Sequence, residues 1–150
     1  MKSKNAIYLE DLAVGDLFKS ESYRLDQEQI IEFARQYDPQ PFHVDPIAAE
    51  NTPFRGLAAS GWHTTAITMR LLVGSFPIGG GMIGAGAEIE WPRATRPGDS
   101  LRVETRVVDI RHSRSKPDRG IVTLECLTKN QNDEICQRLV TKVFVTRRPA

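Results

Sequence analysis

An aspartate and a histidine lie five residues apart in the segment "QYDPQPFHVDP", residues 36–46. Pro39 and Pro41 stand between them, and proline removes backbone freedom, so the relative position of Asp38 and His43 is pre-set. An imidazole beside a carboxylate can hold a water, take a proton from it and later return one. The pair therefore predicts acid–base chemistry. A stiff acidic turn with a structural histidine is the alternative interpretation.

A third element lies downstream, in "AASGWHTTAITMRLLVG". Ser60 can act as the N-cap of a helix that begins at Gly61. The first N–H groups of a helix lack intrahelical partners and lie at the positive end of its dipole. The Gly61 N–H can therefore stabilise an oxyanion that develops on a carbonyl. Acid, base and oxyanion donor together suit the addition of water across an activated double bond, or its reversal.

Other side chains near these residues could contact a substrate. Phe42 and Trp62 could wall a substrate pocket, although simple core packing explains them equally well. Arg93 forms a basic cluster with Arg96, and a second cluster surrounds a later turn: Arg111, Arg114, Lys116 and Arg119. Arginine geometry suits the phosphates of a nucleotide-like carrier. A solvated surface is the alternative for both clusters.

No metal site is expected. His43, Asp45 and His63 could supply ligands, but two residues in a loop and one on a helix match no recognised spacing. Asp45 is instead expected to cap a short helix. Cys126 and Cys136 show no zinc spacing, and without an export signal we expect free thiols.

One helix is expected immediately before the Asp38–His43 pair. Asp26 can cap it, with Gln29 three residues on as the capping-box partner. Apolar residues then recur with helical spacing and define one face: Ile30, Phe33, Ala34 and Tyr37. The helix should end near Asp38, because Pro39 disfavours the helical conformation for the residue before it.

A second helix and a sheet should follow. The run from Ala66 to Val73 is apolar on most sides, which predicts a buried helix that stops near Gly74. Four later segments are rich in β-branched residues with period-2 alternation, which predicts strands: residues 81–92, 100–112, 120–130 and 134–148. Their short turns favour an antiparallel meander, with a β-bulge after Val107. We therefore expect an α+β fold in which the sheet wraps the helix and leaves an edge for a second copy.

Composition sets the broad class. The chain has 150 residues, 40% hydrophobic and 26% charged, which fits one globular domain over residues 1–150. A net charge of +1 provides no bulk attraction to nucleic acid or to an anionic membrane. No segment has the apolar run of a secretory signal or a membrane span, so we expect a cytoplasmic protein.

These motifs resemble the MaoC-like dehydratases, which include the R-specific enoyl-CoA hydratases. The resemblance rests on "YDPQPFHVDPIAA", "GLAASGWHT" and "EWPRATRPGDSL" and extends from about Tyr8 to Arg147. It implies a hot-dog fold, in which an antiparallel sheet surrounds one long helix. It also implies a homodimer or higher homo-oligomer and thioester substrates carried on coenzyme A, without a metal or redox cofactor.

The same resemblance implies roles for individual residues. Asp38 and His43 match the pair that binds and activates water, and Gly61 matches the glycine whose amide polarises the thioester carbonyl. Ser60 is a candidate partner of Asp38. The sequence departs from the hydratase pattern at Gln40, where asparagine is usual, and at Tyr37, where glycine is usual. These larger side chains could change the acyl specificity.

An enoyl-CoA hydratase or dehydratase is therefore the main prediction. A hot-dog acyl-CoA thioesterase is one alternative; it would use a carboxylate at the carbonyl carbon. A non-catalytic acyl-CoA-binding subunit is another. The presence of both Asp38 and His43 argues against each of them.

Overall fold

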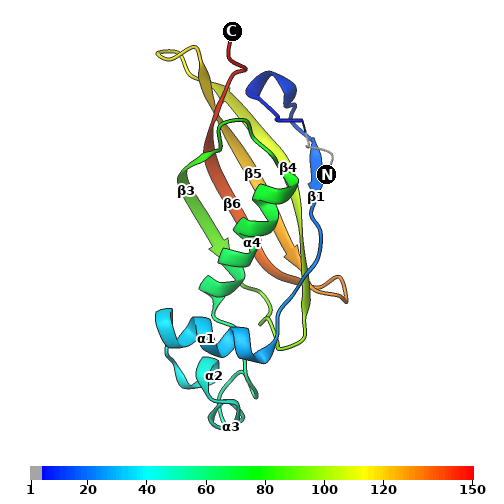
Figure 1. Ribbon diagram of the computed structural model, residues 1–150, viewed down its shortest axis with the longest axis vertical. Helices are drawn as coiled ribbons and strands as arrows, with labels where there is room; N and C mark the ends of the chain where they lie inside the picture. Colours follow the sequence, from blue (N-terminus) through cyan, green and yellow to red (C-terminus); the bar gives the residue numbers. More distant parts are fainter. Residues whose placement is uncertain (1–4) are drawn as a thin grey trace.

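The computed structural model describes residues 5–150, so the two N-terminal lysines at positions 2 and 4 lie outside the described part. A six-stranded antiparallel sheet curves around the helix α4, Gly61–Ser75 (Figure 1). The strands are β1 Leu17–Lys19, β2 Tyr23–Arg24, β3 Ile83–Glu90, β4 Ser100–His112, β5 Arg119–Lys129 and β6 Ile135–Thr146. The predicted α+β hot-dog fold is confirmed.

The sheet order differs from a simple meander. The strands run β1-β4-β5-β6-β3, with β2 also paired to β4. The meander is confirmed for β4, β5 and β6, but the expected continuation from β3 into β4 is wrong, because β3 pairs with β6. The connection over residues 91–99 is too long for a tight hairpin, so it does not force β3 and β4 together. The predicted bulge in β4 is confirmed between Val107 and Asp109.

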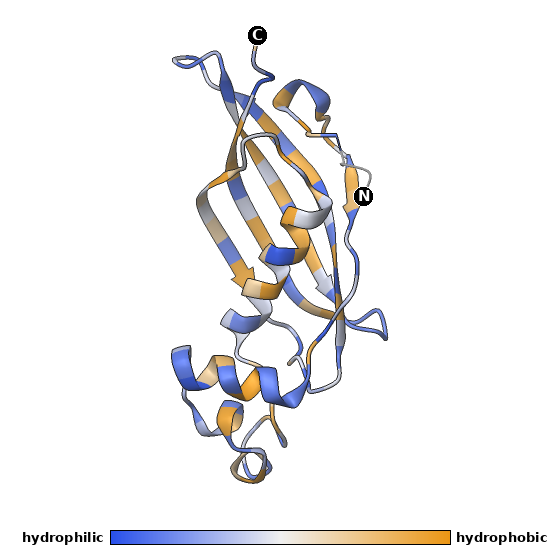
Figure 2. Ribbon diagram, in the orientation of Figure 1, coloured by the Kyte–Doolittle hydropathy of each residue, from blue (hydrophilic) through white to orange (hydrophobic). Residues whose placement is uncertain are grey.

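The hydrophobic core lies between α4 and the concave face of the sheet. Apolar residues alternate with polar ones along the strands (Figure 2), and those facing α4 are fully buried: Leu101, Val103, Val107, Val122, Leu124 and Val145. From α4, Ile67, Leu71 and Leu72 pack against them. The prediction of a buried α4 is wrong for one face of this helix. Trp62, Met69 and Val73 are exposed on that face in the single chain.

Three short helices gather at the N-terminal end of α4 (Figure 1). They are α1 Gln27–Tyr37, α2 Pro41–Val44 and α3 Pro46–Ala49. The predicted capping box is confirmed, since Asp26 accepts from the Gln29 N–H and the Gln29 side chain accepts from the Asp26 N–H. The expectation for Tyr37 is wrong. It is the last residue of α1 and is 69% exposed, whereas Ile30 and Ala34 are buried.

Some short elements carried no periodic signal in the sequence. The 3-10 helix η1, Leu9–Asp11, and strands β1 and β2 have two or three residues each, too few for a pattern to show. Leu9, in η1, and Leu25, immediately after β2, nevertheless belong to the hydrophobic core.

No helix in residues 5–150 is long and apolar enough to cross a membrane.

The two cysteines are buried and free, as predicted. Cys126 on β5 lies opposite Leu139 of β6, so the two thiols do not face each other across the hairpin. Burial raises the pKa of the Cys126 thiol to about 11. A thiol that stays protonated at neutral pH is a poor nucleophile, so Cys126 is a packing residue.

Candidate active site

The end of α1 and the single turn of α2 bring Asp38 and His43 together. Asp38 is the C-cap of α1, and its N–H donates to Ala34 O at 2.8 Å. Pro41 begins α2, so the segment predicted as a stiff loop contains one helical turn, which places His43 inward with 4% exposure. The distance from His43 Nε2 to Asp38 Oδ2 is 3.3 Å.

One backbone contact determines which nitrogen of His43 carries a proton. His43 Nδ1 lies 2.6 Å from Ala58 O. A carbonyl oxygen can only accept, so Nδ1 must be the protonated nitrogen. In the neutral imidazole, Nε2 then presents a lone pair toward Asp38. Two acceptors so close together suit a single water that donates one O–H to each of them.

The Asp38 carboxylate has two further partners. Ser60 Oγ donates to Oδ2 at 2.7 Å, and Gln40 Nε2 donates to Oδ1 at 2.6 Å. Partial burial opposes ionisation, but the hydrogen bonds from Gln40 and Ser60, together with the positive charge that His43 carries when it is protonated, outweigh it, so the pKa of Asp38 is lowered. Asp38 therefore stays ionised at neutral pH. The Gln40 contact was missed by sequence reasoning, which treated this residue only as a change in pocket shape.

Gly61 is the first residue of α4, as predicted, and Ser60 is its N-cap. Ser60 Oγ accepts from the Trp62 N–H at 3.3 Å while it donates to Asp38. The Gly61 N–H has no acceptor within residues 5–150 and lies at the positive end of a 15-residue helix. The Ser60 hydroxyl thus connects the Asp38–His43 pair, here called the dyad, to the N-terminus of α4, where the Gly61 N–H is available as a donor.

The loop before α4 is held by Arg96. Its guanidinium donates to Gly56 O at 3.1 Å, to Leu57 O at 3.2 Å and to Phe54 O. Immediately after this loop, Ala58 accepts from His43, and its own N–H donates to Phe42 O at 3.0 Å. Arg96 was predicted as part of a basic cluster for phosphates. In the structure it fixes the backbone that orients His43.

A cavity of about 270 Å³ opens beside these groups. Six of its lining residues bear on the chemistry: His43, Phe54, Gly61, Thr64, Trp91 and Arg93. Among the residues expected to contact substrate, Arg93 lines the cavity. Phe42 instead packs edge-on against His43, with 4.6 Å between ring centroids. Trp62 packs edge-on against Trp91 at 5.4 Å and is largely exposed, and Ser60 is fully buried against Asp38.

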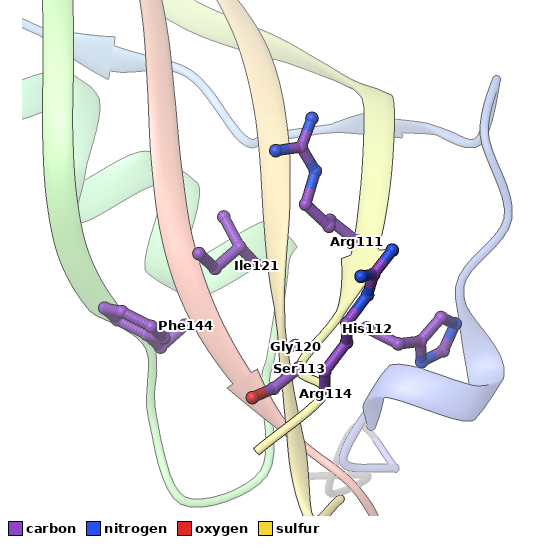
Figure 3. Close-up of a pocket in the computed structure, with 7 residues that line it drawn as sticks. All are labelled: Arg111, His112, Ser113, Arg114, Gly120, Ile121 and Phe144. Carbon is purple, nitrogen blue, oxygen red and sulfur yellow. The ribbon is translucent and has the colours of Figure 1, made fainter. Parts of the chain in front are cut away.

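The basic cluster around the later turn lies elsewhere. Figure 3 shows Arg111 on β4 and Arg114 just after the end of that strand. Together with Ile121 and Phe144 they line a separate pocket of about 480 Å³. β4 has 13 residues, which corresponds to a contour length of ~40 Å, and the pocket lies at its C-terminal end. Within one chain, the two basic clusters therefore lie in different pockets, at different ends of the sheet.

The three residues considered as metal ligands do not converge. Asp45 accepts from the N–H groups of Ile47 and Ala48, and so caps α3 as predicted. His63 stacks on Phe33 with 4.3 Å between ring centroids, and burial lowers its pKa. In the part of the chain that the structure describes, no group of three or more histidine, cysteine or acidic side chains could hold a metal ion.

A comparison with known protein families identifies the family of this chain. The model of the MaoC-like domain matches residues 12–130, which include the dyad, Gly61 and most of the sheet. The chain belongs to the MaoC-like family. A MaoC-like dehydratase from Rhodospirillum rubrum has 55% sequence identity and a TM-score of 0.95, with 97% of this chain and 100% of that chain covered.

A solved (R)-hydratase structure and a curated bacterial protein are also similar to this chain. An (R)-hydratase from A. caviae involved in PHA biosynthesis has 26% identity and a TM-score of 0.74, with 89% of this chain and 97% of that chain covered. The uncharacterized protein YdeM of Bacillus subtilis (strain 168) is 32% identical over 128 residues, which cover 83% of this chain and 89% of YdeM. The MaoC-like family and the similarity to the (R)-hydratase support a hydratase or dehydratase activity in the broad sense.

The substitution Arg96→Met tests whether the guanidinium holds the His43 acceptor in place. It removes three donors from the loop, so local opening should become easier. We expect the amide exchange of Ala58 and Ala59 to accelerate by about tenfold to a hundredfold, as measured by hydrogen–deuterium exchange with NMR. Arg102→Met is the matched control, because Arg102 donates to Asn130 O on another loop. Equal acceleration in both variants would contradict this role.

The substitution Ser60→Ala tests the hydrogen bond to Asp38. Because the folded-state pKa of Asp38 is below its unfolded value, the ionised carboxylate stabilises the fold above the unfolded pKa. That contribution is lost as the pH falls through the folded-state pKa. Removing the Ser60 hydroxyl should raise the pKa of Asp38, as measured by ¹³C NMR of the carboxyl carbon, and should flatten the acid-range dependence of stability. Gln40→Leu should act in the same direction. An unchanged pKa in both variants would show that these hydrogen bonds do not set it.

Proposed function

We propose that this MaoC-like chain adds water across the 2,3 double bond of an acyl-CoA thioester, or removes water to form that bond. The observation that carries the proposal is the pairing of His43 Nε2 with Asp38 Oδ2 beside an unpaired Gly61 N–H. The first two groups can hold and deprotonate a water, and the third can stabilise an enolate oxygen. The family and the resemblance to an (R)-hydratase support the same reaction.

The chemistry follows from where each group lies. A water that donates to His43 Nε2 and Asp38 Oδ2 keeps a lone pair for attack at C3. As the new C–O bond forms, one water proton passes to Nε2, and the double-bond electrons move to the carbonyl oxygen. The Gly61 N–H stabilises that oxygen, and protonation of C2 from the imidazolium restores His43. The proposed reaction requires no metal or redox cofactor.

Other residues support this reaction indirectly. Ser60 and Gln40 position the Asp38 carboxylate through hydrogen bonds. Phe42 and Phe54 pack around His43, with Phe42 to Phe54 centroids 5.0 Å apart, so the imidazole has little room to rotate. Arg93 lines the cavity and is paired with Glu134 at 2.8 Å. We assign Arg93 to the substrate-binding side, where it can approach polar groups of the thioester carrier.

We also propose that two copies of this chain pair through β3 and α4. β3 is an edge strand, and within residues 5–150 no other strand covers its outer edge. All of its residues except Ile89 are exposed. Trp62, Met69 and Val73 leave an apolar stripe exposed on the neighbouring face of α4. An open strand edge beside an exposed apolar helix face is suited to antiparallel pairing with its own copy.

Turnover should depend on the dyad. We expect the parent protein to consume the enoyl-thioester absorbance of crotonyl-CoA or of a longer or branched 2-enoyl-CoA. Asp38→Asn and His43→Ala should each lower kcat by about 10²- to 10⁴-fold with the fold intact. His112→Ala is the control, since His112 lies at the far end of the sheet. Release of free thiol would instead indicate a thioesterase. Binding of acyl-CoA without turnover of any enoyl-CoA would indicate a binding subunit.

The double substitution Met69→Lys with Val73→Lys tests the dimer. Two charges on the exposed stripe should oppose burial against a second copy, so the protein should elute as a monomer with its helical content retained. Light scattering coupled to size-exclusion chromatography would measure the mass. Val108→Lys introduces a charge at another exposed apolar position, on β4, and should leave the dimer intact. A monomeric parent protein would refute the proposed pairing.

A further inference from the structure

Trp91 lies directly against the proposed oxyanion donor. It follows β3 and is the largest side chain that lines the 270 Å³ cavity. A Cβ atom placed on Gly61 would come within 2.6–2.8 Å of three atoms of the indole ring. The ring therefore occupies the space that a side chain at position 61 would fill. The glycine leaves its N–H accessible and also lets the indole approach closely.

A buried glutamine fixes the orientation of this indole. Trp91 Nε1 donates to Gln137 Oε1 at 2.9 Å, and Gln137, on β6, is fully buried. The same oxygen accepts from Thr65 Oγ1 at 2.8 Å, while Gln137 Nε2 donates to Thr68 Oγ1 at 3.1 Å. Thr68 in turn donates to Thr64 O at 2.8 Å. Three of the four hydrogen-bonding positions of the Gln137 side-chain amide are thus occupied, and the network joins Trp91 to α4 and to the sheet.

The size of the cavity limits what fits beside the dyad. A volume of 270 Å³ is about nine times the ~30 Å³ share of one water in the liquid. Within one chain, this space is small for a thioester carbonyl, the reacting carbons and a long acyl chain together. The indole forms one of its walls, so the position of the indole limits how far an acyl chain can extend there. Swinging it aside would break its hydrogen bond to Gln137 and leave the buried Gln137 oxygen with Thr65 as its one remaining donor among the described residues.

We propose that Trp91, held by Gln137, is the residue that restricts this enzyme to short acyl chains. The inference rests on the proposed function, since it concerns the acyl group of the same thioester. Trp91 acts by contact with the substrate, and Gln137 acts as a positioning residue through Trp91. One extra or missing methylene in a hydrophobic pocket changes discrimination by about tenfold or more. The identity of residue 91 should therefore dominate chain-length preference.

The experiment measures the preference for acyl-chain length in two ways, by turnover and by binding. The ratio of kcat/KM for octenoyl-CoA to that for crotonyl-CoA is measured in the parent, Trp91→Ala, Trp91→Phe and Gln137→Leu. The Kd values of the saturated analogues, octanoyl-CoA and butyryl-CoA, are measured by calorimetry on the same proteins. We expect the parent to favour the short chain, and Trp91→Ala to raise both long-to-short ratios by about tenfold or more. Trp91→Phe, a milder change, should shift them less and protects the test against misfolding.

Gln137→Leu distinguishes positioning from contact. It should raise the long-to-short ratio with little change in the pH profile set by Asp38 and His43, because the dyad does not contact Gln137. Gln27→Leu, at an exposed position of α1, should change nothing. Unchanged ratios in both Trp91 variants, with the fold intact, would overturn the inference while leaving the hydratase activity standing. If the Trp91 variants shift the ratio of the Kd values but the parent protein turns over no enoyl-CoA, the role of Trp91 as a wall of the acyl site is supported and the proposed function is refuted. Failure of both acyl-CoAs to bind the parent would overturn both.

Discussion

The hydrogen bond from His43 Nδ1 to Ala58 O, 2.6 Å long, is the contact on which the site depends. It fixes the plane of the imidazole and assigns the proton to the nitrogen that faces away from the cavity. The opposite nitrogen then faces the Asp38 carboxylate as an acceptor. Without this contact, a ring rotation would exchange the two nitrogens, and the dyad would present a donor where the proposed mechanism requires a base.

Other parts of the fold hold the loop of Ala58, and with it this hydrogen bond, in place. Ala58 lies in a loop between two segments that hold it from either side: α2 through Phe42 O, and the connection after β3 through Arg96 and Thr95. The same connection supplies Trp91, whose indole lies against Gly61. The β3–β4 connection thus organises both the base and the oxyanion donor. The sheet contributes its rigidity, because β4, β5 and β6 hold the two ends of this connection at fixed positions.

The local features of the site could be predicted from the sequence, since each depends on residues a few positions apart. The capping box of Asp26 and Gln29, the caps at Asp45 and Ser60 and the close approach of Asp38 to His43 all follow from short-range rules. The sheet around the helix was expected both from the helix and strand patterns and from the resemblance to the MaoC-like family. Pairing of β3 with β6 could not be predicted, because alternation within a strand does not specify its neighbour.

The long-range hydrogen bonds of Arg96 and Gln137 had no signal in the sequence either. Arg96 looked like a surface cation, and Gln137 was one polar residue in an alternating strand. Their partners are 39 to 46 positions away in the loop before α4 and after β3, so only the folded chain brings them together. Tyr37 was misassigned for a similar reason. Its spacing matched the apolar face of α1, but the fold leaves this last residue of the helix largely exposed.

The most direct measurement of the central claim is the tautomer of His43 in the folded protein. Long-range ¹H–¹⁵N correlation spectra of the imidazole, recorded across a pH titration, show which nitrogen keeps its proton when the ring is neutral. The account predicts that Nδ1 remains protonated, with its hydrogen in the bond to Ala58 O, and that Nε2 loses its proton. A neutral His43 with the proton on Nε2 would contradict it, because the group that faces Asp38 and the cavity would then be a donor and could not accept a proton from water.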